Sequence, residues 1–402
     1  MMTKKLCWKK RSLSRSLLSF VSGVKEKSAL NTSSQCILIT PILRVVQKTK
    51  LRKSNKIYVL EYNMLIDLDR EWGTKLYKSL PPLSIPVDHV IEEWELKDPF
   101  KEAGFPHYRA VAFTQTASDA VTLCTEKRRG KGFIFWDNAY NAARGPFRSY
   151  SAVDKMNRDV KRGVESDRIR VYEFPRHGAP DIAAFWQDNA PKKGDVEFLE
   201  DIGENMCSGS VVMVEVLKNS IYDGALSAFC VRNLVRLCKQ KKSTLIFDET
   251  ASAVRCGRLW AFEYLENIFP DYIIFGKSLY ASGVCAPIFR SSRKVCKKEF
   301  GAASRHSYGV TSYIMYCILK NVKIDLHSVE DAKKKLQMRI SDLFEGWFSD
   351  FQWLGLLGAS EFHDHNDKDR YVQTTLRSNE DVTIKFVRNE NRARFMGWVD
   401  VI

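Results

Sequence analysis

The stretch LIFDETASAVRCGRLWAFEYLENIFPDYIIFGKSL, residues 245–279, decides the fold of this chain. It opens and closes with a short apolar run, and each run stops at a charged residue, Asp248 in the first and Lys277 in the second. Short, almost wholly apolar runs are typical of buried strands in a parallel sheet. Because parallel strands end at the same edge of a sheet, the sequence predicts that a carboxylate and an amine reach one edge together.

A strand–helix–strand unit leads into this stretch. Residues 211–215 and 244–248 are apolar runs, and residues 226–240 between them repeat apolar side chains at helical spacing. The predicted apolar stripe consists of Leu226, Phe229, Leu234, Leu237 and Cys238. Such crossovers build a mostly parallel sheet with flanking helices, in which ligands bind at the carboxyl ends of the strands. We therefore predict an α/β fold.

Residues 245–283 resemble the class III aminotransferases along their whole length. The family pattern is an apolar strand with Asp-Glu, a loop with Arg and Gly, an aromatic run, Pro-Asp, and a strand before Gly-Lys. This chain has these features in that order, as Phe247-Asp248-Glu249, Arg255, Gly257, Leu259-Trp260-Ala261-Phe262-Glu263-Tyr264, Pro270-Asp271 and Phe275-Gly276-Lys277. The resemblance implies the pyridoxal phosphate (PLP) dependent transferase fold type I, with a smaller C-terminal α+β domain.

In this family two residues carry the chemistry, and both have counterparts here. The resemblance implies that Lys277 forms a Schiff base with pyridoxal 5'-phosphate, the expected cofactor. It also implies that Asp248 keeps the pyridine nitrogen protonated, so that the ring can act as an electron sink. The alternative for Lys277 taken by itself is an ordinary solvated loop lysine.

Residues 113–120, FTQTASDA, resemble the family's phosphate loop, above all its glutamate-1-semialdehyde aminomutase-like version. Backbone N–H groups at the start of the following helix, with the Ser118 hydroxyl, suit a phosphate dianion. The alternative is an ordinary Ser or Thr helix cap. Ala117 stands where the family usually has Gly, which tightens the turn and weakens the expected contact with the cofactor.

The resemblance implies three further cofactor contacts. Tyr140 follows the predicted strand 133–136 and matches the aromatic residue that stacks on the cofactor, although an aromatic at this place is otherwise a core residue. Thr250 matches the residue that covers the other face of the ring, where relatives often have Val. Ser307 matches a hydroxyl donated to the phosphate of the neighbouring subunit, which implies a homodimer.

The expected function is that of a PLP-dependent aminotransferase or aminomutase. It would act on a small amino or oxo compound, with an amino donor and an oxo acceptor as partners. The alternative is a degenerate member of the fold that serves as a non-catalytic interaction module. Its support is the set of departures from the family pattern: Ala117, Asn141, Ala142, Val216 and Ser307.

At 402 residues the chain is long enough for a large and a small domain. We divide it into a basic tail (1–56), an N-terminal segment of the small domain (57–110), a large PLP-binding domain (111–300) and a C-terminal small domain (301–402). The last of these should contain a long helix with one apolar face, formed by Leu336, Ile340, Leu343, Phe344 and Trp347. Its final residues, 381–402, should supply strands.

Nearly all of the net charge of +15 lies in the tail, which holds fourteen Lys or Arg residues and one acid, Glu26. This composition fits an organellar transit peptide, a disordered extension, or a segment that binds nucleic acid or an anionic surface. We expect a cytoplasmic protein, or a mitochondrial or plastid one if the tail is a transit peptide.

The remaining composition narrows the class of protein. Ten cysteines without CxxC spacing favour reduced thiols and no metal site. No run of eighteen or more apolar residues occurs, so no transmembrane helix is expected.

Overall fold

The computed structural model describes residues 56–61, 64–69, 98–114, 116–126, 132–136, 169–172, 174–175, 177–218, 221, 223–279, 281–289, 328–343, 346, 348–362, 383–386 and 392–396. All of them belong to Lys50–Ile402, the larger of two units into which the chain divides. Tyr140, Ser307 and the tail up to residue 55 lie outside the described residues. The predicted division into four segments stays a prediction.

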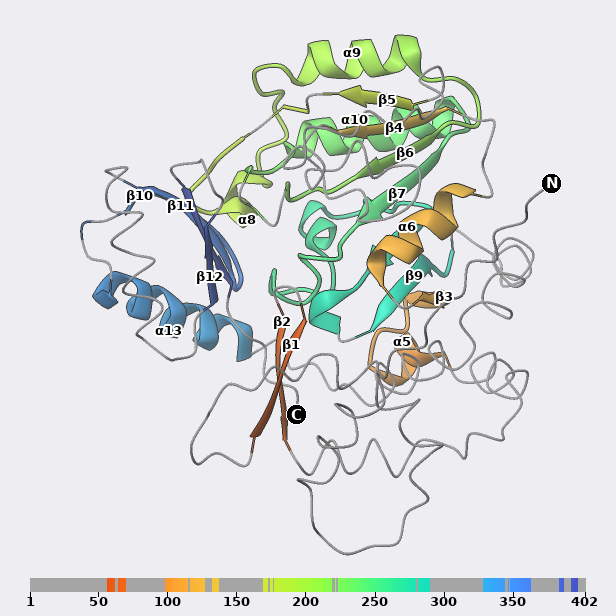
Figure 1. The fold of residues 1–402 in the computed structure, drawn as a ribbon. Helices are drawn as coiled ribbons and strands as arrows, with labels where there is room; N and C mark the ends of the chain where they lie inside the picture. Colours follow the sequence, from red (N-terminus) through yellow and green to blue (C-terminus); the bar gives the residue numbers. More distant parts are fainter. Residues whose placement is uncertain are drawn as a thin grey trace, which may run out of the picture. The chain divides into compact units, whose positions relative to one another are not determined.

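A seven-stranded sheet carries the predicted motifs (Figure 1). Its strands are β3 (Tyr108–Thr114), β4 (Phe133–Trp136), β5 (Ile169–Tyr172), β6 (Val211–Val214), β7 (Thr244–Asp248), β8 (Tyr272–Phe275) and β9 (Ser282–Pro287). Their order is β3-β9-β8-β7-β6-β4-β5. Only β9 runs against the others in this sheet. The predicted mostly parallel sheet is therefore confirmed.

Helices cover both faces of this sheet because its strands are apolar on both sides. In β7, Ile246 packs with α6 (Ala117–Glu126), whereas Leu245 and Phe247 belong to the cluster that contains α10 (Ala228–Gln240). Successive side chains of a strand point to opposite faces, so an unbroken apolar run requires a cover on each. Figure 1 shows α6 and α10 beside the sheet, with α9 (Asp195–Asn205) next to α10.

The helix of the predicted strand–helix–strand unit begins later than its apolar run. Ser227 accepts a hydrogen bond from the Cys230 backbone N–H at 2.9 Å, so it caps α10 and helical residues start at Ala228. Leu234 and Cys238 are buried as predicted, but Phe229 and Leu237 keep part of their surface exposed. The buried face is instead completed by Ala228, Cys230 and Val231.

The C-terminal part forms a second sheet and a helix, as the fold class predicted. The strands β10 (Phe348–Leu354), β11 (Leu357–Phe362), β12 (Thr383–Phe386) and β13 (Arg392–Met396) are all antiparallel, in the order β10-β11-β13-β12. The helix is α13 (Ser328–Leu343), with Leu336 and Ile340 buried. The remaining elements are β1 (Lys56–Glu61), β2 (Met64–Asp69), α5 (Pro99–Glu102), α8 (Ile182–Phe185), η3 (Ala261–Leu265) and η4 (Lys277–Leu279).

The turn between β10 and β11 contacts the loop that follows β7. The Leu356 backbone N–H donates to the Arg255 carbonyl at 2.6 Å. Gly355 has φ +56°, and a Cβ there would overlap the Arg255 carbonyl oxygen and the Cys256 backbone. Glycine is therefore required for this close approach.

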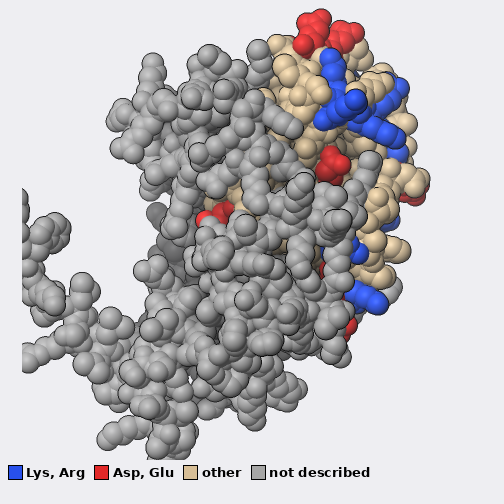
Figure 2. Space-filling view, turned by 90° about the vertical axis from the view of Figure 1, so that its right-hand side faces the viewer, with Lys and Arg blue, Asp and Glu red and all other residues tan. Residues whose placement is uncertain are grey.

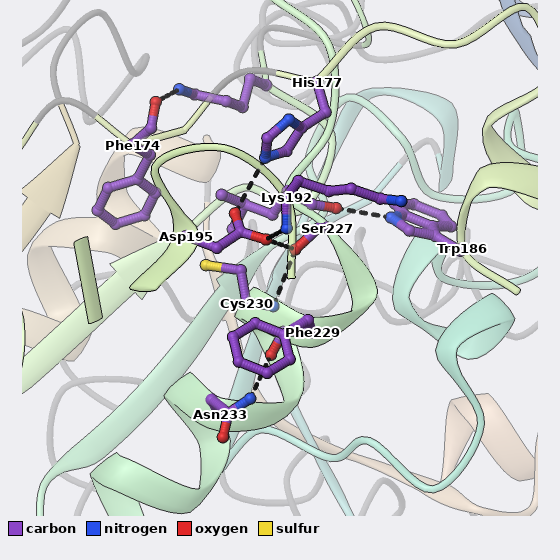
Figure 3. A network of polar contacts seen from close by, with 11 residues as sticks. Phe174, His177, Trp186, Lys192, Asp195, Ser227, Phe229, Cys230 and Asn233 are labelled. Atoms are coloured by element: carbon purple, nitrogen blue, oxygen red, sulfur yellow. Dashed lines mark hydrogen bonds and ion pairs between the residues drawn. The ribbon is translucent and has the colours of Figure 1, made fainter. Parts of the chain in front are cut away.

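A buried carboxylate ties three separate segments together beside α10 (Figure 3). Asp195 begins α9 and is 0% exposed. It accepts hydrogen bonds from His177 Nε2 at 2.9 Å, from the Lys192 backbone N–H at 2.8 Å, and from the Ser227 hydroxyl. Burial alone would raise the pKa of this carboxyl, but the hydrogen bonds from His177 and Ser227 outweigh it and hold the pKa below its ordinary value.

Candidate active site

The two charged residues that end the apolar runs lie at the same edge of the large sheet. Asp248 is the last residue of β7 and pairs with Ile274 of β8, and Lys277 follows the end of β8 after Gly276. Burial raises the pKa of Asp248, while the nearby Thr250 hydroxyl, the hydrogen bond from the Thr250 backbone N–H and the Lys277 charge oppose that rise. Both side chains keep part of their surface accessible. The predicted carboxylate and amine are thus close enough to interact.

The chain is tightly constrained where Lys277 leaves the strand. Lys277 has φ +42°, a left-handed conformation that costs energy for any residue with a side chain. A Cβ on Gly276 would lie 3.1 Å from Thr250 Cγ2 and 3.2 Å from Ala117 Cβ. Gly276, Thr250 and Ala117 are therefore neighbours, which brings three predicted elements of the site into contact: the phosphate loop, the Asp-Glu-Thr segment and the Gly-Lys segment.

Helix α6 begins at this edge, directly after β3. Thr116 caps it: the Asp119 N–H donates to Thr116 Oγ1 at 3.2 Å, and the Thr116 N–H donates to Asp119 Oδ2 at 3.1 Å. An ordinary cap is thus present, but at Thr116. Ala117 and Ser118 occupy the first helical positions, where amides and the helix dipole favour an anion. Their roles toward a phosphate stay predictions.

Thr250 adds polar groups beside Asp248. Its backbone N–H donates to Asp248 Oδ1 at 2.9 Å. Its hydroxyl is buried and has no hydrogen bond of ordinary geometry within the described residues, although it lies near enough to Asp248 to help lower the pKa of that carboxyl. Such an unsatisfied buried hydroxyl is uncommon in folded proteins.

Glu249 organises the loop behind the site, and its role was not predicted. Its wholly buried carboxylate accepts hydrogen bonds from the backbone N–H groups of Ala261 at 3.1 Å and Phe262 at 3.2 Å, and from the Ser252 hydroxyl. Burial raises its pKa to about 7. The residue is part of the Asp-Glu pair, so the motif contained the signal, but its partners lie eleven or more positions away except for Ser252.

Glu215, expected to have a structural role, directly follows β6 and is 8% exposed. Because Val214 pairs with Phe247, Glu215 stands next to Asp248 along the edge of the sheet. Tyr140 and Ser307 are outside the described residues, so their predicted contacts stay predictions.

No family model matches the sequence. It is 28% identical over 153 residues to an adenosylmethionine-8-amino-7-oxononanoate aminotransferase of Helicobacter pylori, a match that spans 34% of this chain and 35% of that enzyme. Among solved structures, a Bacillus anthracis aminotransferase superposes with a TM-score of 0.57 at 14% identity, over 92% of this chain and 95% of that one. The lysine aminotransferase of Mycobacterium tuberculosis gives 0.55 at 14% identity, over 90% and 93%.

The chain has the fold of these aminotransferases. The predicted PLP-dependent transferase fold type I is therefore confirmed, and these similarities support the predicted resemblance to the class III aminotransferases. The aminomutase-like branch stays a prediction. In this fold the Asp248 and Lys277 edge corresponds to the carboxyl ends of parallel strands, where open α/β sheets bind their ligands.

The described surface of this class III fold carries both signs of charge. Figure 2 shows Lys and Arg side chains close to Asp and Glu on one face. Within the described parts of the chain, no helix combines the length and the apolar character needed to cross a bilayer. The described residues also contain no cluster of three or more His, Cys, Asp or Glu side chains suited to a metal ion.

Proposed function

We propose that this chain is a PLP-dependent aminotransferase that acts on a small amino compound and a small oxo acceptor. The observation that carries the proposal is the meeting of Asp248 and Lys277 at one edge of the sheet, close enough for the lysine charge to lower the pKa of the carboxyl. Relatives with aminotransferase names, in sequence and in structure, support the same reaction class.

The residues at this edge fit the cofactor. Asp248 offers a partly buried carboxylate for a pyridine N–H, and the first turn of α6 offers amides at Ala117 and Ser118 for a phosphate. Thr250 offers a buried hydroxyl with no hydrogen-bond partner among the described residues. Ala117 stands where relatives usually have Gly, and a side chain at Gly276 would meet its Cβ at 3.2 Å.

When bound, PLP supplies an electron sink that stabilises negative charge on the substrate Cα. The Asp248 carboxylate holds the proton on the pyridine nitrogen, which that sink requires. Lys277 would hold the cofactor covalently at rest. Its Nζ, when free, would serve as the base that takes the proton from the substrate Cα. The left-handed backbone at Lys277 sets the direction in which its side chain leaves the main chain.

Cofactor uptake tests the proposal. Purified protein mixed with PLP should absorb near 420 nm, about the position for an imine of PLP, and borohydride should fix the cofactor to the chain. Lys277→Ala should abolish the fixed cofactor, and Lys192→Ala, a lysine on another segment, should not. Wild-type protein that takes up no PLP at millimolar supply would instead favour the non-catalytic interaction module.

The finer reaction type is part of the proposal. An aminotransferase passes the amino group to a separate oxo acceptor, whereas the aminomutase option keeps it on one carbon skeleton. Incubation with ¹⁵N-labelled amino donor and unlabelled acceptor separates the two, because only a transferase gives labelled product from the acceptor. We infer transfer, since the named relatives are aminotransferases.

We also infer a homodimer, with Ser307 reaching the phosphate of the neighbouring subunit. An isolated subunit would then have an incomplete cofactor site. Sedimentation of the PLP-loaded protein should give twice the chain mass of 46.3 kDa. A fully loaded, active monomer would contradict this inference. Removal of residues 1–56 should leave loading and dimerisation unchanged.

A further inference from the structure

Thr250 combines two features that are seldom found together. Its side chain is 8% exposed, yet its hydroxyl makes no hydrogen bond within the described part of the chain. Its backbone N–H meanwhile donates to Asp248 Oδ1 at 2.9 Å. A buried hydroxyl left without a partner is costly, so its retention beside a key carboxylate calls for a reason.

The rest of the side chain is held in place. A Cβ on Gly276 would lie 3.1 Å from Thr250 Cγ2, so the methyl group packs against the segment that leads into Lys277. With the methyl group on that side and the backbone N–H bonded to Asp248, the hydroxyl stays beside the Asp248 carboxylate, where it helps to lower the pKa of that carboxyl.

The charges around Asp248 show why a neutral donor is useful. Lys277, after β8, favours the ionised carboxylate of Asp248. Burial adds a further tendency toward the neutral acid. A hydroxyl donor stabilises the carboxylate whether or not Lys277 carries a charge.

We propose that Thr250 is a positioning residue whose hydroxyl donates a second hydrogen bond to Asp248 and keeps that carboxylate charged and aligned. The inference rests on the proposed function, because a charged Asp248 matters there for holding the proton on a pyridine nitrogen. Valine has the shape of threonine but no hydroxyl donor. In Thr250→Val the side chain would still pack against the pyridine ring, but Asp248 would keep only the hydrogen bond from the backbone N–H of residue 250.

The first test needs no cofactor. Unfolding of the full chain is compared for wild type, Thr250→Val, Asp248→Asn and the double variant. We expect the two changes to be non-additive at neutral pH, and the non-additivity to disappear in acid, where Asp248 is protonated. The variants Thr250→Ser and Thr250→Ala differ mainly by the hydroxyl. If the hydroxyl makes no bond to the Asp248 carboxylate, the difference in unfolding free energy between these two variants should be the same with and without Asp248→Asn.

The second test follows the absorbance of protein-bound PLP against pH. Thr250→Val should move the midpoint of its titration to a different pH from wild type, because Asp248 gains a proton more readily, and Thr250→Ser should restore the wild-type midpoint. Additive energies and an unchanged midpoint in Thr250→Val would overturn the proposal. Non-additivity in a chain that takes up no PLP would support the Thr250–Asp248 bond while refuting the proposed function.

Discussion

Asp195 provides the sharpest test of how this fold is held together. Asp195→Ala removes the acceptor shared by the Ser227 hydroxyl, His177 Nε2 and the Lys192 backbone N–H. A buried donor left without its partner costs about 1–3 kcal/mol. Ser227 is 0% exposed and bears most of that cost, whereas the His177 side chain is 12% exposed and can turn toward water.

We therefore expect Asp195→Ala to lower the free energy of unfolding by about 3–4 kcal/mol. Asp195→Asn should cost less, because its amide oxygen still accepts from one or two donors. The control is Asp201→Ala on the exposed side of the same helix, which should change stability by about 0.5 kcal/mol or less. The measurement is urea unfolding, with hydrogen exchange at the first turn of α10 reporting the local effect.

The pH dependence gives an independent check on the same carboxylate. The pKa of Asp195 is lower in the folded chain than in the unfolded one, so its stabilising effect is fully present above about pH 4. It is lost as the pH falls through the lowered value. The difference between wild type and Asp195→Asn should shrink over that acidic range. If Asp195→Ala unfolds at the same urea concentration as wild type at neutral pH, the network has no role in stability.

Three more changes have defined outcomes. Glu249 has a folded-state pKa raised from 4.5 to about 7. The free energy of unfolding of wild type should therefore fall by about 3 kcal/mol relative to that of Glu249→Gln between pH 4.5 and pH 8. A difference in unfolding free energy that stays constant with pH would refute the assignment. Gly355→Ala should destabilise by more than about 1 kcal/mol. Gly203→Ala, in helix α9, where the added Cβ would make ordinary contact with Leu237, should stabilise by about 0.5–1 kcal/mol, and equal effects would contradict the close approach at Gly355. Asp248→Asn should retain the fold and some PLP but lose most turnover, and near-normal turnover would show that Asp248 has another role.

The C-terminal hairpin is a part of the fold that the sequence did not predict. The strands β10 and β11, residues 348–362, were not predicted. Strand β10 lacks regular alternation, because its register shifts between Ser349 and Gln352 and Asp350 has φ +50°. The predicted helical face also extended to Phe344 and Trp347, which lie outside the described residues, while the described helix α13 is Ser328–Leu343. A bulged strand has no clear period, so only its pairing with a partner strand identifies it.

The sequence by itself predicted that Asp248 and Lys277 lie at the ends of strands at one edge of the sheet, and the structure has them there. An apolar run that stops at one charged residue places that residue at a strand end, and the strand–helix–strand pattern makes neighbouring ends coincide. This information is local in the chain, which is why Asp248 and Lys277 could be assigned from it.

Only the tertiary structure decided how the site is supported. The contact of Ala117 and Thr250 with Gly276, the capture of the Ala261 and Phe262 amides by Glu249, and the Asp195 network all join residues far apart in sequence. The burial of a polar group, and therefore its pKa and its need for a partner, depends on which segments pack around it. No periodicity in one segment specifies that packing.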